Sequence, residues 1–232
     1  MPAALLRLET TPDLVDRAYR ALLDAISSGL LAPGQRLMQE ELAAQLAVSR
    51  QPVLQALRLL KQDGLVLDAP GRGLQVAPLE AAAVLQVYQV RGALDALAAR
   101  LAAERRVRLP AALLRAGRQA ARGSDVHAMI EADIAFHRAL YAASGNAYVA
   151  RAAETHWAHL KRAMGAVLQH GRLRRPVWDE HEAIARAVAS GDADAAAQAA
   201  SSHTEQAGRY MAAHLHGPDL QPRAARVLGD HR

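Results

Sequence analysis

The 232-residue sequence contains no cysteine, and its only phenylalanine is Phe136. Without cysteine there are no disulfides and no thiolate ligands, so a bound metal must be held by histidine, aspartate or glutamate. Aromatic residues make up 3% of the chain, which argues against a stacking platform for single-stranded RNA. The chain also lacks an apolar run long enough for a membrane span or a signal peptide. We therefore expect a cytoplasmic protein with no membrane partner.

The charge of the chain is basic but unevenly distributed. It has 28 lysines and arginines against 23 aspartates and glutamates, a formal net charge of +5. Such a balance suits an anionic partner, although it also occurs in proteins that bind no nucleic acid. Residues 1–77 carry eight residues of each sign, so the excess lies in residues 78–232. Net charge alone therefore locates no DNA-binding surface.

The first third of the chain mixes helical and strand patterns. Apolar spacing predicts helices ending at Gly29, over 40–46 and over 50–62, and strands over 65–67 and 74–76. Ser49 suits the cap of the third helix, and Pro52 falls in its first turn, where a missing N–H costs nothing. A Pro-Gly-Arg-Gly turn at 70–73 joins the two strands. Two short helices across a tight turn, followed by a hairpin, are typical of a winged helix-turn-helix.

The expected helix over 50–62 has a polar, basic face. Its apolar residues are spaced to pack inward, and no acid lies between Arg50 and Lys61. Arginine pairs bidentately with guanine and glutamine with adenine, so this face has the chemistry that reads bases. A solvated basic face without a partner is the alternative, and the hairpin and helix spacing favour DNA. The candidate DNA-binding residues are Arg50, Gln51, Gln55, Arg58, Arg72 and Gly73.

Beyond Pro78 the pattern is helical, and ligand-type residues interrupt its apolar stripes. Asp133 and His137 lie four residues apart and so share one face of a helix, while His181 and His203 lie in two further stripes. Any one such histidine is more often a hydrogen-bonded core residue, and the Asp/His pair alone is common on surfaces. Four of them on facing helices can nevertheless converge. One aspartate and three histidines suit Zn²⁺, Ni²⁺, Mn²⁺ or Fe²⁺.

Arg91 interrupts another apolar stripe with a charge that is always present. Two interpretations stay open at this point. The side chain either reaches solvent or pairs with a neighbouring acid, or it binds the carboxylate of a ligand. Further along, the apolar spacing predicts one long helix over 147–169.

Several runs in the first third resemble, in order, the winged helix of GntR-type bacterial repressors. They are Ser28-Gly29, Pro33-Gly34-Gln35-Arg36-Leu37, Glu41-Leu42-Ala43, Val48-Ser49-Arg50, Pro52-Val53, Ala56-Leu57, Gly64-Leu65-Val66 and Gly71-Arg72-Gly73. Leu54 stands where that family usually has an arginine. If that arginine contacts DNA, the resemblance implies an operator that differs from the common half-site.

The remaining helical part resembles the FCD domain of the FadR branch, an effector-binding and dimerisation domain. The matching runs are Val90-Arg91-Gly92-Ala93-Leu94-Asp95, Asp133-Ile134-Ala135-Phe136-His137, Ser144-Gly145-Asn146, Glu180-His181 and Ser190-Gly191-Asp192 leading to His203. The resemblance implies that Asp133, His137, His181 and His203 are metal ligands. Asp95 replaces the more usual glutamate, and Thr204 replaces an aliphatic residue, without loss of a ligand.

We expect a mainly α-helical protein in which a winged helix-turn-helix precedes an all-helical antiparallel bundle. The expected parts are a leader over 1–11, the winged helix-turn-helix over 12–77, the effector-binding and dimerisation domain over 78–216 and a disordered tail over 217–232. We expect a homodimeric repressor that binds double-stranded operator DNA, and we do not expect an enzyme. A divalent metal ion and a small carboxylate effector, the latter held by Arg91, are expected in the helical domain.

Two other roles for the four-ligand site stay open. A metal held by one aspartate and three histidines can activate water, as in a hydrolase. However, no further acid stands out as a general base, and a hydrolase leaves the winged helix unexplained. In the other alternative the metal is purely structural, and the helical domain serves only for dimerisation.

Overall fold

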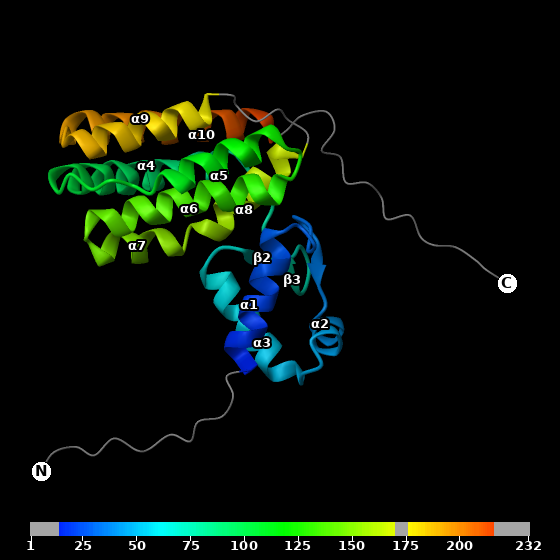
Figure 1. Cartoon of the computed structure of the whole chain (residues 1–232). Helices are drawn as coiled ribbons and strands as arrows, with labels where there is room; N and C mark the ends of the chain where they lie inside the picture. The colour runs from blue at the N-terminus through cyan, green and yellow to red at the C-terminus, as the bar shows by residue number, and fades with distance from the viewer. Residues whose placement is uncertain (1–13, 170–175, 216–232) are drawn as a thin grey trace, which may run out of the picture. The chain divides into compact units, whose positions relative to one another are not determined.

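The computed structural model describes residues 14–169 and 176–215 (Figure 1). The expected leader and the expected tail over 217–232 lie outside the described residues. Contacts divide the chain into two compact units, Met1–Pro78 and Leu79–Arg232. No described helix is both long enough and apolar enough to cross a membrane.

The first unit is a winged helix-turn-helix, as predicted. Its elements are α1 (Leu14–Ser27), β1 (Arg36–Leu37), α2 (Gln39–Gln45), α3 (Arg50–Gln62), β2 (Val66–Asp68) and β3 (Leu74–Val76). The strands form an antiparallel sheet in the order β1-β3-β2, in which Leu67 lies opposite Gln75. We call the β2–β3 hairpin, residues 66–76, the wing. Strand β1 was not expected, because two residues are too few to show an alternating pattern.

Helices α1 and α3 provide the core of this unit. Leu22 and Ile26 of α1 and Val53 and Leu57 of α3 are all buried. The Tyr19 hydroxyl of α1 also donates a hydrogen bond of 2.7 Å to the Asp63 carboxylate, at the end of α3. Ser49 is the N-cap of α3, as expected, but its side chain makes no capping hydrogen bond within the described part of the chain. Apolar packing against α1 and the Tyr19–Asp63 hydrogen bond therefore orient α3.

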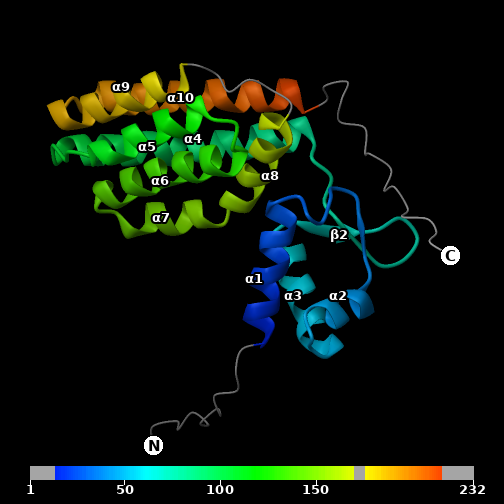
Figure 2. The same ribbon diagram turned by 45° about the vertical axis from the view of Figure 1, so that its right-hand side comes forward.

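The second unit is an antiparallel bundle of helices (Figures 1 and 2). Its helices are α4 (Ala81–Glu104), α5 (Ala111–Arg122), α6 (Val126–Ser144), α7 (Ala147–Glu154), α8 (Trp157–Leu168), α9 (Val177–Ser190) and α10 (Ala193–His214). The prediction of one helix over 147–169 was wrong, because the chain turns at Thr155 and His156. No glycine or proline marks this break in the sequence.

Helix α4 is the centre of the bundle and contacts α6, α8, α9 and α10. Small side chains allow these close approaches, since Ala98 and Ala102 of α4 are fully buried. Gly208 of α10 lies directly against Tyr88 of α4, where an added Cβ atom would be 2.7 Å from the tyrosine Cβ. This close contact brings the polar residues of α10 next to those of α4 and α6.

Candidate metal centre and DNA-binding face

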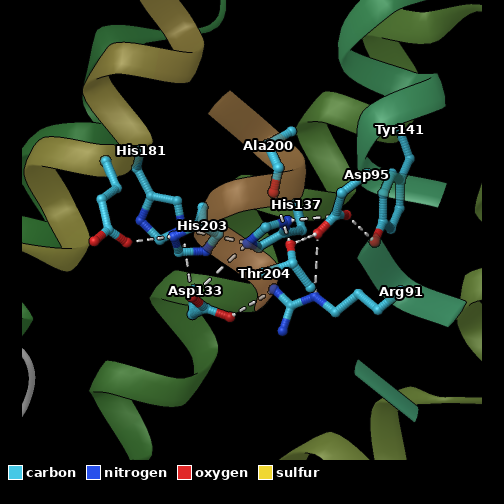
Figure 3. A network of polar contacts seen from close by, with 10 residues as sticks. Arg91, Asp95, Asp133, His137, Tyr141, His181, Ala200, His203 and Thr204 are labelled. Atoms are coloured by element: carbon cyan, nitrogen blue, oxygen red, sulfur yellow. Dashed lines mark hydrogen bonds and ion pairs between the residues drawn. The ribbon is translucent and has the colours of Figure 1, made fainter. Parts of the chain in front are cut away.

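Three helices bring the four ligand-type residues together in the interior of the bundle (Figure 3). Asp133 and His137 lie one turn apart on α6, His181 is on α9 and His203 is on α10. One ligand atom from each residue lies within 4.8 Å of every other, and all four residues are at most 7% exposed. The apolar stripes in which they lie face one another, which explains their convergence.

The distances within this cluster fit a coordinated ion. The Nε2 atoms of His137 and His181 are 3.2 Å apart. Oδ1 of Asp133 lies 3.5 Å from Nε2 of His181 and 3.9 Å from Nε2 of His137. A tetrahedral ion with ligand bonds of about 2.1 Å separates its donor atoms by roughly 3.4 Å. The donor set, nitrogen with one carboxylate oxygen, is also one that divalent transition metals accept.

Two carboxylates hold the outer ring nitrogens of two of these histidines. Nδ1 of His137 lies 3.3 Å from Oδ1 of Asp95, and Nδ1 of His203 lies 2.8 Å from Oε2 of Glu180. Carboxylates behind the ligand histidines of a metal site fix ring orientation and tautomer in the same way. By contrast, the buried Nδ1 atom of His181 has no hydrogen-bond partner within the described residues. The sequence did not predict that Asp95 and Glu180 contact these histidines, because each contact joins two different helices.

Burial disfavours the charged forms of His137 and His181. It lowers the pKa of His137, an effect to which the nearby Arg91 guanidinium adds. The pKa of His181 lies well below its ordinary value because of burial, and the neighbouring His203 and His137 lower it further. Burial alone would raise the pKa of Asp95, but His137, Arg91 and the Thr204 hydroxyl together hold it below its usual range. Neutral imidazoles beside an ionised carboxylate are the protonation states that metal binding requires.

Arg91 is buried beside the cluster and pairs with two acids. Its Nη2 atom lies 3.2 Å from Oδ2 of Asp133, and its Nε atom lies 3.4 Å from Oδ2 of Asp95. Its guanidinium also lies over the rings of Tyr88 and Trp157. Burial opposes its charge, but the two carboxylates outweigh burial and raise the pKa of Arg91. Arg91 thus pairs with neighbouring acids, which was one of the roles considered for it. Its side chain does not reach solvent, because the residue is only 3% exposed.

A small hollow adjoins Arg91 on the side of α7 and α8. It is too tight to hold a water molecule and is lined by Arg91, Leu94, Tyr141, Ala153, His156, Trp157 and Leu160. The buried indole N–H of Trp157 has no hydrogen-bond partner within residues 14–169 and 176–215. The surface that lines the hollow is almost entirely apolar.

The six candidate DNA-binding residues are all exposed, on α3 and at the turn of the wing. The Arg50 side chain is 69% exposed and forms an ion pair of 2.7 Å with Glu40 of α2. The ammonium of Lys61 pairs instead with Asp68 of the wing at 2.6 Å. The face of α3 that carries Gln51, Gln55 and Arg58 therefore presents polar and positive groups to solvent.

Arg36 of β1 holds the turn of the wing, a role that the sequence did not indicate. Its guanidinium donates hydrogen bonds to the carbonyls of Pro70, at 2.6 Å, and Arg72, at 3.1 Å. Gly71 and Gly73 adopt positive φ angles of 87° and 92°, which side chains disfavour. The wing tip is thus shaped by two glycines and one arginine from another strand.

Comparison with known proteins covers both units. The family model of bacterial regulatory proteins, gntR family, matches residues 14–76, and that of the FCD domain matches residues 86–216. An HTH-type transcriptional regulator in an unstable DNA locus of Streptomyces ambofaciens is 35% identical over 190 residues, which cover 80% of this chain and 79% of that protein. For an HTH-type transcriptional regulator of Agrobacterium vitis, the 38% identity extends over 85 residues, 37% of this chain and 50% of the relative.

Two further similarities span most of the chain. The probable D-xylose utilization operon transcriptional repressor of Paenarthrobacter nicotinovorans is 29% identical over 77% of this chain and 80% of its own length. The crystal structure of a putative GntR transcriptional regulator from Rhodococcus sp. RHA1 superposes with a TM-score of 0.71 at 26% identity, covering 85% of this chain and 96% of that one. These relatives are transcriptional regulators rather than enzymes. The chain belongs to the GntR family of bacterial transcriptional regulators and carries an FCD domain after its winged helix-turn-helix.

Proposed function

We propose that the protein is a dimeric repressor whose affinity for its operator is set by a small organic acid bound beside a divalent metal ion. The four-ligand cluster is the observation that carries this proposal. Its donor atoms lie within 4.8 Å of one another in the interior of the FCD domain. The name of the Paenarthrobacter relative, a probable repressor, supports the sign of regulation.

Operator binding is assigned to α3 and the wing. Arg50, Gln51, Gln55 and Arg58 reach solvent from α3, a helix without acidic residues. Arginine and glutamine side chains on such a helix read base edges in the major groove, while the wing carrying Arg72 contacts the backbone or the adjacent groove. Family membership supports the same assignment.

The metal is assigned to Asp133, His137, His181 and His203. The cluster and its surroundings contain three carboxylates, those of Asp133, Asp95 and Glu180, against the single guanidinium of Arg91. The carboxylates outnumber the guanidinium by two (three minus one), which matches the charge of a divalent cation. When bound, the ion supplies positive charge and open coordination positions to an anionic ligand.

The effector is assigned to the hollow beside Arg91. As it stands, the hollow has no room for even a water molecule, so a small acid enters only if the surrounding side chains move. A ligand carboxylate there would compete with Asp133 and Asp95 for the guanidinium, and the Trp157 indole offers a second donor. The ligand changes operator affinity only through its different affinities for the two arrangements of the dimer.

Dimerisation is assigned to the outer face of α4. Val90 and Leu97 lie two turns apart on this helix and are 47% and 42% exposed, with Ala93 between them. An exposed apolar strip of this kind favours contact with a second copy. Twofold symmetry then predicts a palindromic operator.

A titration on DNA selected from a random-sequence pool tests this function. Protein stripped with a chelator and reloaded with Zn²⁺ is mixed with hydroxy acids, amino acids or sugar acids, and operator binding is followed by fluorescence anisotropy. We expect one ion per chain and at least one acid that shifts operator affinity by roughly tenfold.

The near-complete burial of the candidate ligands also suits a metal with a purely structural role. That alternative holds if the ion binds but no acid shifts the affinity.

A further inference from the structure

Asp95 of α4 lies behind the four-ligand cluster rather than within it (Figure 3). It is fully buried, and its two oxygens have different neighbours. Oδ1 faces Nδ1 of His137 at 3.3 Å and accepts a hydrogen bond of 2.6 Å from the Tyr141 hydroxyl. Oδ2 accepts a hydrogen bond of 2.6 Å from the Thr204 hydroxyl and lies 3.4 Å from Nε of Arg91. One carboxylate thus connects α4, α6 and α10.

We propose that Asp95 is a positioning residue that fixes the tautomer of His137, an inference that rests on the metal-binding role proposed above. An ionised carboxylate can only accept a hydrogen bond, so Nδ1 of His137 carries the proton. A neutral imidazole has a single N–H, and Nε2 is therefore left with a free lone pair. That lone pair is directed toward Asp133 and His181, where the ion would lie.

The three histidines of the cluster differ in how firmly they are held. His137 is held by a carboxylate that has no exposed surface and that two hydroxyls orient. His203 is held by Glu180, whose side chain is 19% exposed. His181 has no partner on Nδ1 among the described residues. Of the two carboxylates, Asp95 is therefore the one that is fully buried and held by further hydrogen bonds, although Glu180 lies closer to its histidine, at 2.8 Å against 3.3 Å.

The substitution Asp95→Asn makes a specific prediction, because the two sides of the carboxylate have different donors. Arg91 can only donate, so the amide oxygen is expected on the side of Arg91 and Thr204, where Oδ2 now lies. The amide NH₂ group then faces Nδ1 of His137 and donates to it. The imidazole proton is consequently displaced to Nε2, which removes the lone pair from the cluster.

Long-range ¹H–¹⁵N correlation spectra of the metal-free, ¹⁵N-histidine-labelled full-length protein report the tautomer directly. We expect the Nδ1–H tautomer for His137 in the wild type and the Nε2–H tautomer in Asp95→Asn. Competition with a chelator should show that the variant binds Co²⁺ roughly 10- to 100-fold more weakly. An Nε2–H tautomer in the wild type overturns the proposal, and this measurement suffices even if the variant does not fold.

Two matched variants separate positioning from a general loosening of the core. Tyr141→Phe removes a hydroxyl from Asp95 but keeps the carboxylate, so the tautomer of His137 should not change. Glu180→Gln should affect the ring of His203 and leave that of His137 as it was. A change of the His137 tautomer in either variant contradicts the assignment to Asp95. If the wild type shows the expected tautomer but binds no Co²⁺, the metal function fails and the positioning role remains.

Discussion

Arg50 and Glu40 form an ion pair at the start of α3, with 2.7 Å between Nη1 and Oε1. The pair joins the two helices of the helix-turn-helix, and both side chains are largely exposed. Exposed pairs of this kind contribute little to stability. Phosphates or bases can therefore displace Glu40 if Arg50 binds DNA as proposed, although Glu40 weakens that contact.

Substitution of these two residues should change operator binding in opposite directions. Arg50→Ala removes a base-reading group and should weaken specific binding by at least about tenfold without change in metal content. Glu40→Gln frees Arg50 and removes an acid close to the DNA, so affinity should rise about two- to fivefold. Anisotropy titrations over a range of salt concentrations measure both effects. Unchanged affinity of Arg50→Ala would remove α3 from the assigned interface.

His181→Ala should reduce the metal load of the purified protein. The residue contributes one of four ligand atoms and is fully buried, so its loss leaves a gap in the coordination shell. His127→Ala is the matched control, since His127 is an exposed histidine at the start of α6. Elemental analysis after dialysis should find less than one ion per chain in the first variant and an unchanged load in the second. A full load in His181→Ala would exclude this residue from the site.

Among the helices, α4 and α10 are packed closely enough for a single methyl group to matter. A Cβ atom at Gly208 would lie 2.7 Å from the Cβ atom of Tyr88, a distance that side chains do not tolerate. The two helices must therefore separate if residue 208 becomes larger. Because Thr204 and His203 lie one turn earlier on α10, the same displacement moves the polar network.

Gly208→Ala should destabilise the FCD domain by about 1–3 kcal/mol, the usual effect of overpacking a core. Gly165→Ala is the control on α8, where an added Cβ meets no atom within 4 Å. That change should leave stability unaltered or raise it by up to about 1 kcal/mol, because alanine favours a helix. Urea unfolding followed by circular dichroism compares the two. Equal stabilities would show that α4 and α10 adjust without strain.

At the scale of the whole molecule, the chain consists of two compact units with separate cores. The polar network lies entirely within the second unit, and the residues proposed to bind DNA lie within the first. Binding of an ion to the native FCD domain stabilises that unit by an amount set by the ion concentration relative to Kd. The winged helix-turn-helix gains no such direct contribution.

Removal of the metal should therefore lower the unfolding temperature of one unit selectively. At an ion concentration 100-fold above Kd, the lost stabilisation is about 2.7 kcal/mol. Differential scanning calorimetry with and without a chelator should show a transition that shifts downward and another that does not. The same scan on His181→Ala should be insensitive to the chelator. Loss of stability in both transitions would contradict independent cores.

The sequence predicted the fold where periodicity extends over several turns. Except over 147–169, where one helix was predicted and two are present, the apolar stripes correctly indicated the helices of the bundle. They also identified Asp133, His137, His181 and His203 as interruptions within the stripes. Strand β1 was not predicted because two residues are too few to show a periodic pattern. The break between α7 and α8 was not predicted because no glycine or proline marks it.

Contacts between elements were beyond the reach of pattern analysis. Asp95 and Thr204 are 109 positions apart, yet their side chains form a hydrogen bond of 2.6 Å. Likewise, no pattern in the sequence indicated that Arg36 donates hydrogen bonds to the turn at 70–73. Spacing along one helix or strand reveals which side chains share a face, but not which face of another element they meet.

The hydrogen bonds from Arg36 to the wing bear on which substitutions the turn at 70–73 can accept. Arg36 binds the backbone carbonyls of Pro70 and Arg72, and no side chain of the turn takes part in these two hydrogen bonds. These two hydrogen bonds therefore do not depend on which side chain stands at position 72. If the wing contacts DNA as proposed, residue 72 can change while these bonds are kept, so that recognition at the wing can diversify.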